Sequence, residues 1–112
     1  MNQDIQQIQI SIEDCKEKIA LGECLKRLSK NRDFKKLIEQ CYFKDEAHRL
    51  VMVKASPNCQ DEAVQKDIIK DMDGIGCLYQ FFCAIGSEAE TMAHNLKQHE
   101  DMRDELEEAD ED

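Results

Sequence analysis

Residues 71–86 read DMDGIGCLYQFFCAIG, a stretch that is apolar at helical spacing around most of its circumference. In a helix, Ile68, Ile75 and Phe82 fall close to one line, and neighbouring positions widen that line into a stripe. This pattern predicts a helix at the centre of the fold. The predicted core residues on this helix are Ile68, Ile75, Leu78, Tyr79, Phe82 and Ile85.

The apolar spacing of this stretch continues beyond it in both directions. Steps of three and four residues lead from Val64 through the central stripe to Leu106. A 3.5-residue repeat is typical of coiled coils, so we predict one long C-terminal helix. The alternative is a break at Gly86, where Ser87 to Glu90 forms a new capping box and the last helix folds back.

A continuous helix of this length is longer than the rest of the chain is expected to cover. Residues 87–112 are therefore predicted to be an exposed helix with an acidic tail that meets a partner. The partner-interface candidates on it are Met92, Leu96, His99, Arg103 and Leu106. Ile8 and Ile10 are further candidates, because they alternate with period two in a possible extended arm over residues 1–10.

Three shorter helices are expected between the arm and the long helix. The first begins at the capping-box-like Ser11, the second spans residues 34–42 and the third residues 46–55, with Ser56-Pro57 as its stop. The predicted fold class is all-α, a bundle of three shorter helices around the long C-terminal helix. The predicted division is a flexible or extended arm over residues 1–10, a helical core domain over residues 11–86 and the exposed helix with its acidic tail over residues 87–112.

The net charge of −10 is concentrated at one end of the chain. Residues 100–112 hold nine acidic residues and one arginine, whereas residues 1–99 carry a net charge of only −2. A clustered acidic end is typical of a solvated tail. The basic run over residues 26–36 has no nucleic-acid motif around it, so we do not expect nucleic-acid binding. This run could instead pair with the acidic tail of a neighbouring copy.

Six cysteines in a short chain would indicate a disulfide framework if a secretory signal were present. The N-terminal residues show no such signal, and no segment has the length of a membrane span. The cysteines are therefore interpreted as reduced packing residues of an intracellular protein. No cysteine or histidine pair has the spacing of a zinc site, and no metal ligand or cofactor is expected.

The sequence contains no arrangement of residues that indicates catalysis. Gly74 and Gly76 lie inside a helical pattern and lack the other positions of a phosphate loop. Asp71 lies on the apolar stripe and is predicted to cap a helix or to form a salt bridge with Arg27 or Arg49. Neither a nucleophile with its base nor a pair of acidic residues is apparent, and we expect that the protein is not an enzyme.

Several short runs resemble a group of small helical proteins of tailed bacteriophages that are encoded among virion and assembly genes. The resemblance covers residues 11–90. It is carried by Ser11–Asp14, Ala20–Glu23, Asp33–Ile38, Tyr42-Phe43, Glu46-Ala47, Arg49–Val51, Pro57, Ile75-Gly76 and Gln80–Phe82. Cys15, Cys24 and Cys77 depart from it, at positions where small residues are expected. The resemblance implies a structural or assembly role and no catalytic residues.

Two hypotheses of function follow from these observations. The first is a bacteriophage structural or virion-assembly protein, a homo-oligomer that binds other virion or assembly proteins through helices. The second is a small acidic inhibitor of a host nucleic-acid-binding enzyme. A third, a metal-binding or redox module, would require bound zinc. The expected location is the host cell cytoplasm or the virion, without membrane association.

Overall fold

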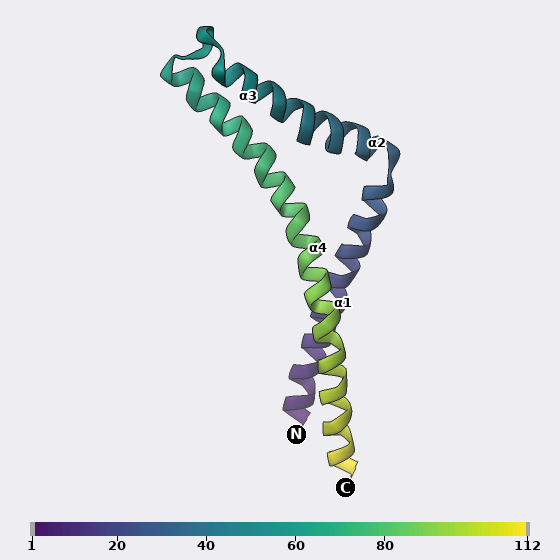
Figure 1. The fold of residues 1–112 in the computed structure, drawn as a ribbon. Helices are drawn as coiled ribbons and strands as arrows, with labels where there is room; N and C mark the ends of the chain where they lie inside the picture. Colours follow the sequence, from purple (N-terminus) through teal and green to yellow (C-terminus); the bar gives the residue numbers. More distant parts are fainter. Residues whose placement is uncertain (1, 112) are drawn as a thin grey trace. The chain divides into compact units, whose positions relative to one another are not determined.

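The computed structural model describes residues 2–111, and all regular structure in that range is helical (Figure 1). The elements are α1 (Asn2–Lys30), α2 (Arg32–Phe34), the π-helix η1 (Lys35–Glu46), α3 (Ala47–Ala55), the 3₁₀ turn η2 (Pro57–Cys59) and α4 (Glu62–Glu111). The predicted all-α class and long C-terminal helix are confirmed. Met1 and Asp112, the outermost residues of the expected arm and tail, lie outside the described residues.

Helix α4 continues through Gly86, the position at which the sequence left a break open. Gly86 is half-buried, and a Cβ atom placed on it would lie 3.8 Å from Cδ2 of Leu25. A glycine inside a helix costs about 1 kcal/mol relative to alanine. Because the heptad positions on both sides of Gly86 are packed, that cost does not end the helix.

The chain divides into two compact units, and α4 contributes to both. The first, called here the terminal helix pair, consists of residues 1–26 and 84–112. The second, called here the central hairpin, consists of residues 27–83. These units differ from the expected core domain over residues 11–86 and exposed helix over residues 87–112, because the end of α4 packs with the start of α1.

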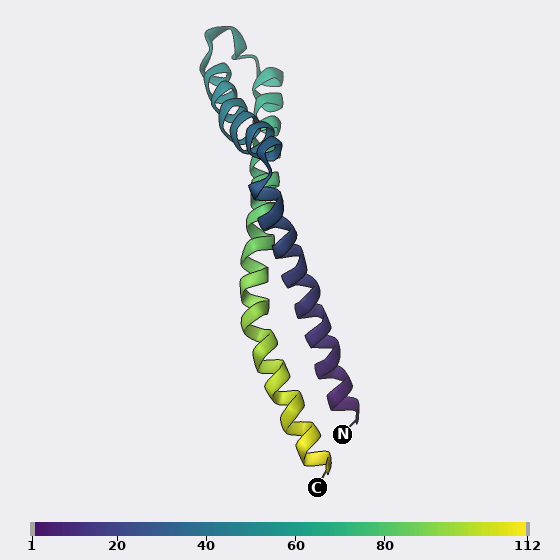
Figure 2. The ribbon, with the colours of Figure 1, turned by 90° about the vertical axis from the view of Figure 1, so that its right-hand side faces the viewer.

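The terminal helix pair is antiparallel, and Figure 2 shows its two helices side by side. Residues 2–10, expected as an extended arm, are the first turns of α1. The reason is that steps of three and four residues extend back to the start of the chain. The buried or half-buried row on α1 is Ile5, Ile8, Ile12, Cys15, Ile19 and Gly22. Ile10, which fitted only the period-two pattern, is 63% exposed.

The core of the central hairpin lies between α3 and the first part of α4. Leu50, Ile68 and Ile75 are buried. Six half-buried residues pack against them: Tyr42, Phe43, Ala47, Val53, Cys59 and Met72. Ser56 has an extended backbone before Pro57, which ends α3 as expected. The Gln65 side-chain amide donates to the carbonyls of Lys54, at 3.0 Å, and Cys59, at 2.6 Å, and thereby closes the turn.

The π-helix η1 replaces the break that was expected between residues 42 and 46. Phe34 and Phe43 are nine residues apart, which is two and a half turns of an α-helix at 3.6 residues per turn, so an α-helix would place them on opposite sides. A π-helix has about 4.4 residues per turn, and nine residues then make about two turns. Both rings consequently contact Phe82 of α4, with centroid distances of 5.7 Å and 6.3 Å.

The junction between α1 and α2 is a single residue, Asn31. Its side-chain oxygen accepts a hydrogen bond from the backbone N–H of Phe34 at 2.9 Å. Asn31 is therefore the N-cap of the following helix.

Candidate interaction surfaces

The predicted partner-interface residues on α4 lie in the terminal helix pair and are half-buried there. This set is Met92, Leu96, His99, Arg103 and Leu106. The Sγ–H of Cys15 donates to Sδ of Met92 at 3.7 Å, and Nη1 of Arg103 donates to Oε1 of Gln9 at 3.4 Å. The side of α4 that the heptad repeat marks is thus occupied by α1 of the same chain. Ile8 is half-buried in the row on α1.

Lys18 links the two helices of the terminal pair by charge. Its Nζ lies 3.0 Å from Oε1 of Glu88 on α4 and 3.2 Å from Oδ2 of Asp14 on α1. The hydrogen bond to Glu88, followed by that to Asp14, raises the pKa of Lys18 above its ordinary value. Because the two partners lie on different helices, this ion pair favours one register of α1 against α4.

Small residues bring α1 and α4 close together at Gly22. A Cβ atom placed on Gly22 would overlap the Cβ of Ala89. A cavity of about 220 Å³ adjoins this contact. It is lined by Ile19, Gly22, Glu23, Leu25, Lys26, Gly86, Ala89, Glu90 and Ala93. The small side chains explain both the close approach and the cavity beside it.

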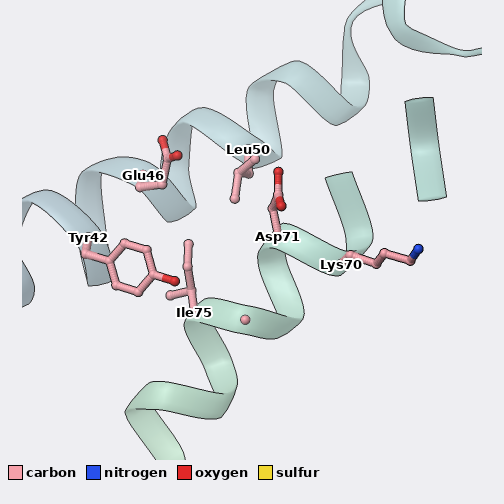
Figure 3. Close-up of a pocket in the computed structure, with 7 residues that line it drawn as sticks. Tyr42, Glu46, Leu50, Lys70, Asp71 and Ile75 are labelled. Atoms are coloured by element: carbon pink, nitrogen blue, oxygen red, sulfur yellow. The ribbon is translucent and has the colours of Figure 1, made fainter. Parts of the chain in front are cut away.

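The central hairpin contains a cavity of about 290 Å³, shown in Figure 3. Its lining residues are Tyr42, Glu46, Leu50, Lys70, Asp71, Gly74 and Ile75. Figure 3 shows Tyr42 and Glu46 on one helix and Asp71 and Ile75 on the other, with the Tyr42 hydroxyl directed toward α4. The cavity is therefore lined by both charged side chains, such as Glu46 and Asp71, and apolar side chains, such as Ile75.

The acidic groups of this cavity are influenced by Arg49. Both carboxylate oxygens of Glu46 accept hydrogen bonds from Arg49, one of them at 2.9 Å. These bonds hold the pKa of Glu46 below its ordinary value and raise the pKa of Arg49, to which the charge of Asp71 also contributes. Since both Glu46 oxygens are engaged, this carboxylate is poorly placed to accept a proton from a substrate. Asp71 is exposed at the edge of the cavity, and its pairing with Arg27 or Arg49 stays a prediction, since only the effect of its charge on the pKa of Arg49 is observed.

The predicted core residues differ in their burial. Ile68 and Ile75 are 6% and 7% exposed, while Leu78, Phe82 and Ile85 are half-buried. Tyr79 is 50% exposed, although its ring packs edge-on against Phe43 at a centroid distance of 5.4 Å. Tyr79 therefore belongs to the border of the core and not to its interior.

Large apolar side chains are exposed mainly on the central hairpin. Eight such residues in the described structure belong to it: Leu28, Leu37, Val51, Met52, Val64, Ile69, Tyr79 and Phe81. Three others, Ile10, Leu21 and Met102, belong to the terminal helix pair. Periodicity does not indicate this distribution, because an apolar row is buried only where another helix is present to cover it.

The net charge, in contrast to the exposed apolar residues, is concentrated on the terminal helix pair. The central hairpin carries ten basic and nine acidic residues, a net charge of +1. The terminal helix pair carries five basic and 16 acidic residues, a net charge of −11. One unit is thus apolar and nearly neutral on its surface, and the other is strongly acidic.

Comparison with models of protein families, with curated proteins and with solved structures gave no match. Within residues 2–111, no group of three or more His, Cys, Asp or Glu side chains is placed to hold a metal ion. None of the helices in that range combines the length and apolar character needed to cross a membrane.

Proposed function

We propose that this protein is a non-enzymatic bacteriophage structural or virion-assembly protein that acts through helix-mediated protein–protein contacts. The bacteriophage setting rests on the resemblance of residues 11–90 to small helical phage proteins. The interaction role rests on one observation above all, the exposed apolar side chains of the central hairpin.

Each unit consists of two helical segments packed against each other, so each apolar row is covered from one side only. Leu37, Val51, Met52 and Phe81 are 53–61% exposed on the central hairpin. Exposed apolar side chains that gather on one part of a protein often mark an interaction site. Helices supplied by partners would cover these residues and complete a bundle around α4.

Association with virus particles tests this proposal. The protein is produced during phage infection, mature particles and assembly intermediates are purified, and the copy number of this chain in each is measured by quantitative mass spectrometry. We expect a constant stoichiometry in one of the two fractions. Absence from both fractions, together with normal particle yield when the gene is disrupted, would contradict the proposal.

A second candidate is a small acidic inhibitor of a host nucleic-acid-binding enzyme, and the charge of the terminal helix pair favours it. Acidic side chains that mimic nucleic acid act on a basic site through charge. In this case the exposed acidic residues at the end of α4 would bind the host enzyme, and the central hairpin would have another role.

Neutralising the tail separates the two candidates without disturbing the helix pair. The variant replaces Glu105, Glu107, Glu108 and Asp110, all exposed, by the corresponding amides and keeps the half-buried Arg103 and Leu106. A matched control neutralises four exposed acidic residues elsewhere in the same unit, namely Asp4, Glu13, Glu17 and Glu90. Loss of host-enzyme inhibition in the tail variant alone, with normal particle assembly, would support the inhibitor. If neither the wild type nor either variant changes the activity of host nucleic-acid-binding enzymes, the result would support the assembly role.

A further inference from the structure

The first part of α4 carries a second row of residues at heptad spacing, beside the row that packs in the hairpin core. Steps of four and three residues separate its members along one side of the helix. We call this the uncharged row: Gln65, Ile69, Met72, Gly76, Tyr79 and Cys83. The charged residues Asp67, Lys70 and Asp71 project from other sides of the helix, the last two at the edge of the cavity. A side of α4 spanning 19 residues is thus free of charge.

This row is only partly covered by the rest of the hairpin. Ile69 is 44% exposed and Tyr79 is 50% exposed. A Cβ atom placed on Gly76, near the middle of the row, would meet no other atom within 4 Å. A helix in a solvated position rarely leaves such a long side without charge, so this row resembles a buried seam that lacks its neighbour.

Residues of the opposing helix border the row. Phe43 contacts Tyr79, and Ala47 and Met72 both pack against the hairpin core. Val51, one helical turn beyond Ala47, is 53% exposed. Phe43, Ala47 and Val51 therefore extend the uncharged row into a face that is two helices wide.

We propose that a second copy of this chain packs against this face, so that two central hairpins form a four-helix bundle with the uncharged rows at its seam. The inference rests on the proposed function, in which helix-mediated contacts carry the activity. It names the surface and the occupant.

The distribution of charge favours self-association through the central hairpin. Self-association through the terminal helix pair is less favourable. Two central hairpins bring together units of net charge +1, whereas two terminal helix pairs would bring together units of net charge −11. At the seam itself no charged group would lose its hydration, which is the main penalty in burying helices with mixed surfaces.

The row is also compatible with the two-fold symmetry that a homodimer requires. An antiparallel axis at Gly76 places Ile69 of one copy at the level of Cys83 of the other, a large side chain beside a small one. It also opposes the two Gly76 residues, where the helices can approach closely. Asp73, on the outer border of the row, and the nearby Lys66 remain at the rim, as charged groups do in protein interfaces.

The dimensions of the face predict a weak dimer. A row from residue 65 to residue 83 is about 27 Å long at 1.5 Å per residue. Two adjacent helices are about 20 Å wide, which gives about 500 Å² per copy. This area is at the lower end for a specific protein interface, so we expect association in the micromolar range.

Substitution of Gly76 tests the proposal, because the open space around it means that a larger side chain leaves the hairpin intact. In sedimentation equilibrium, the full chain should change from monomer to dimer as its concentration rises through the micromolar range. Gly76→Glu places a carboxylate in the seam from both copies and should weaken association at least ten-fold, with helicity and Tm no lower than in the wild type. Ala63→Glu adds the same charge to an exposed position of α4 outside the row and should associate like the wild type.

A wild type that remains monomeric at several hundred micromolar would overturn the inference. So would a Gly76→Glu variant that dimerises as the wild type does. These outcomes are separable from the proposed function. A monomeric chain that is still a constant component of particles removes the self-association and keeps the assembly role. A chain that dimerises but never associates with particles removes the assembly role and keeps the self-association.

Discussion

Gly22 of α1 faces Ala89 of α4 so closely that a methyl group on Gly22 would overlap the Ala89 side chain. This contact fixes the position of α1 along the axis of α4 in the terminal helix pair. It also explains why a glycine lies in the middle of a 29-residue helix. The approach depends on two small residues that are 67 positions apart in the sequence.

Gly22→Ala should lower the free energy of unfolding by about 1–3 kcal/mol, because overpacking at this contact outweighs the better helix propensity of alanine. Gly76→Ala, measured at a protein concentration at which the chain is monomeric, provides the control, since its added methyl group meets nothing else in the chain within 4 Å. That variant should gain about 0.5–1 kcal/mol from helix propensity. Urea denaturation of both variants measures the difference, and equal stabilisation of the two would contradict the observed helix contact.

The six cysteines should differ sharply in their reactivity with an alkylating reagent. Cys15 is 2% exposed and lies against Met92, whereas Cys41, Cys77 and Cys83 are exposed. Mass spectrometry after brief treatment with iodoacetamide should find Cys41, Cys77 and Cys83 modified and Cys15 protected until the protein is denatured. Rapid modification of Cys15 in the native protein would show that the terminal helix pair opens.

Substitution of Cys15 should reveal the apolar character of its site. Cys15→Ala removes one buried sulfur atom and should cost about 1 kcal/mol. Cys15→Ser should cost more, about 1–3 kcal/mol, because a buried hydroxyl loses hydrogen bonds to water and Met92 accepts only weakly. Thermal unfolding of the two variants compares them, and a serine variant as stable as the alanine variant would indicate that water reaches the site.

Phe43 should contribute far more to stability than Leu37, although both lie in η1. Phe43 contacts Tyr79 and Phe82, whereas Leu37 is 61% exposed. We expect Phe43→Ala to lower the free energy of unfolding by about 2 kcal/mol. Leu37→Ala should change it by less than about 0.5 kcal/mol. If η1 were an α-helix, Phe43 would point away from Phe34 and α4, and the two variants would be similar.

The ion pair of Glu46 and Arg49 should make a small part of the stability depend on acidic pH. Its hydrogen bonds lower the pKa of Glu46 in the folded state, so this contribution is present above the ordinary pKa of a glutamate and is lost as pH falls through the lower, folded-state value. Glu46→Gln should therefore reduce the loss of stability on acidification, as measured by thermal unfolding between pH 7 and pH 3. Glu39→Gln, in the same helix, is the matched control, since it removes a carboxylate and keeps the ion pair of Glu46 and Arg49.

Much of the fold could be predicted from periodicity and stop signals. The all-α class, the long C-terminal helix and the stop at Ser56-Pro57 depend on local spacing, proline stereochemistry and the apolar repeat, which are properties of neighbouring residues. The same reasoning identified Ile68 and Ile75 as core residues. It failed at residues 42–46, which were expected to break the helix and instead form the end of the π-helix Lys35–Glu46.

The candidate surfaces could be predicted only in part, because their exposure depends on which helix covers which row. The repeat at Met92, Leu96 and Leu106 was assigned to a partner interface, and the structure places α1 against it. The exposed residues Val51, Ile69 and Phe81 were missed. The only signal for them in the sequence is that apolar residues recur at helical spacing on sides of the helices that no other predicted helix would cover.

The sequence by itself determined where helices form, since the repeat that ends at Leu106 and the row that begins at Ile5 are local patterns of apolar residues. The tertiary structure decided how those rows are used. Small residues at Gly22 and Ala89 let α1 approach the end of α4, and this contact takes up the side that the repeat had offered to a partner. The uncharged row around Gly76 is only partly covered, because the aromatic residues of η1 pack on α4 around Phe82 and leave Ile69 and Gly76 facing outward.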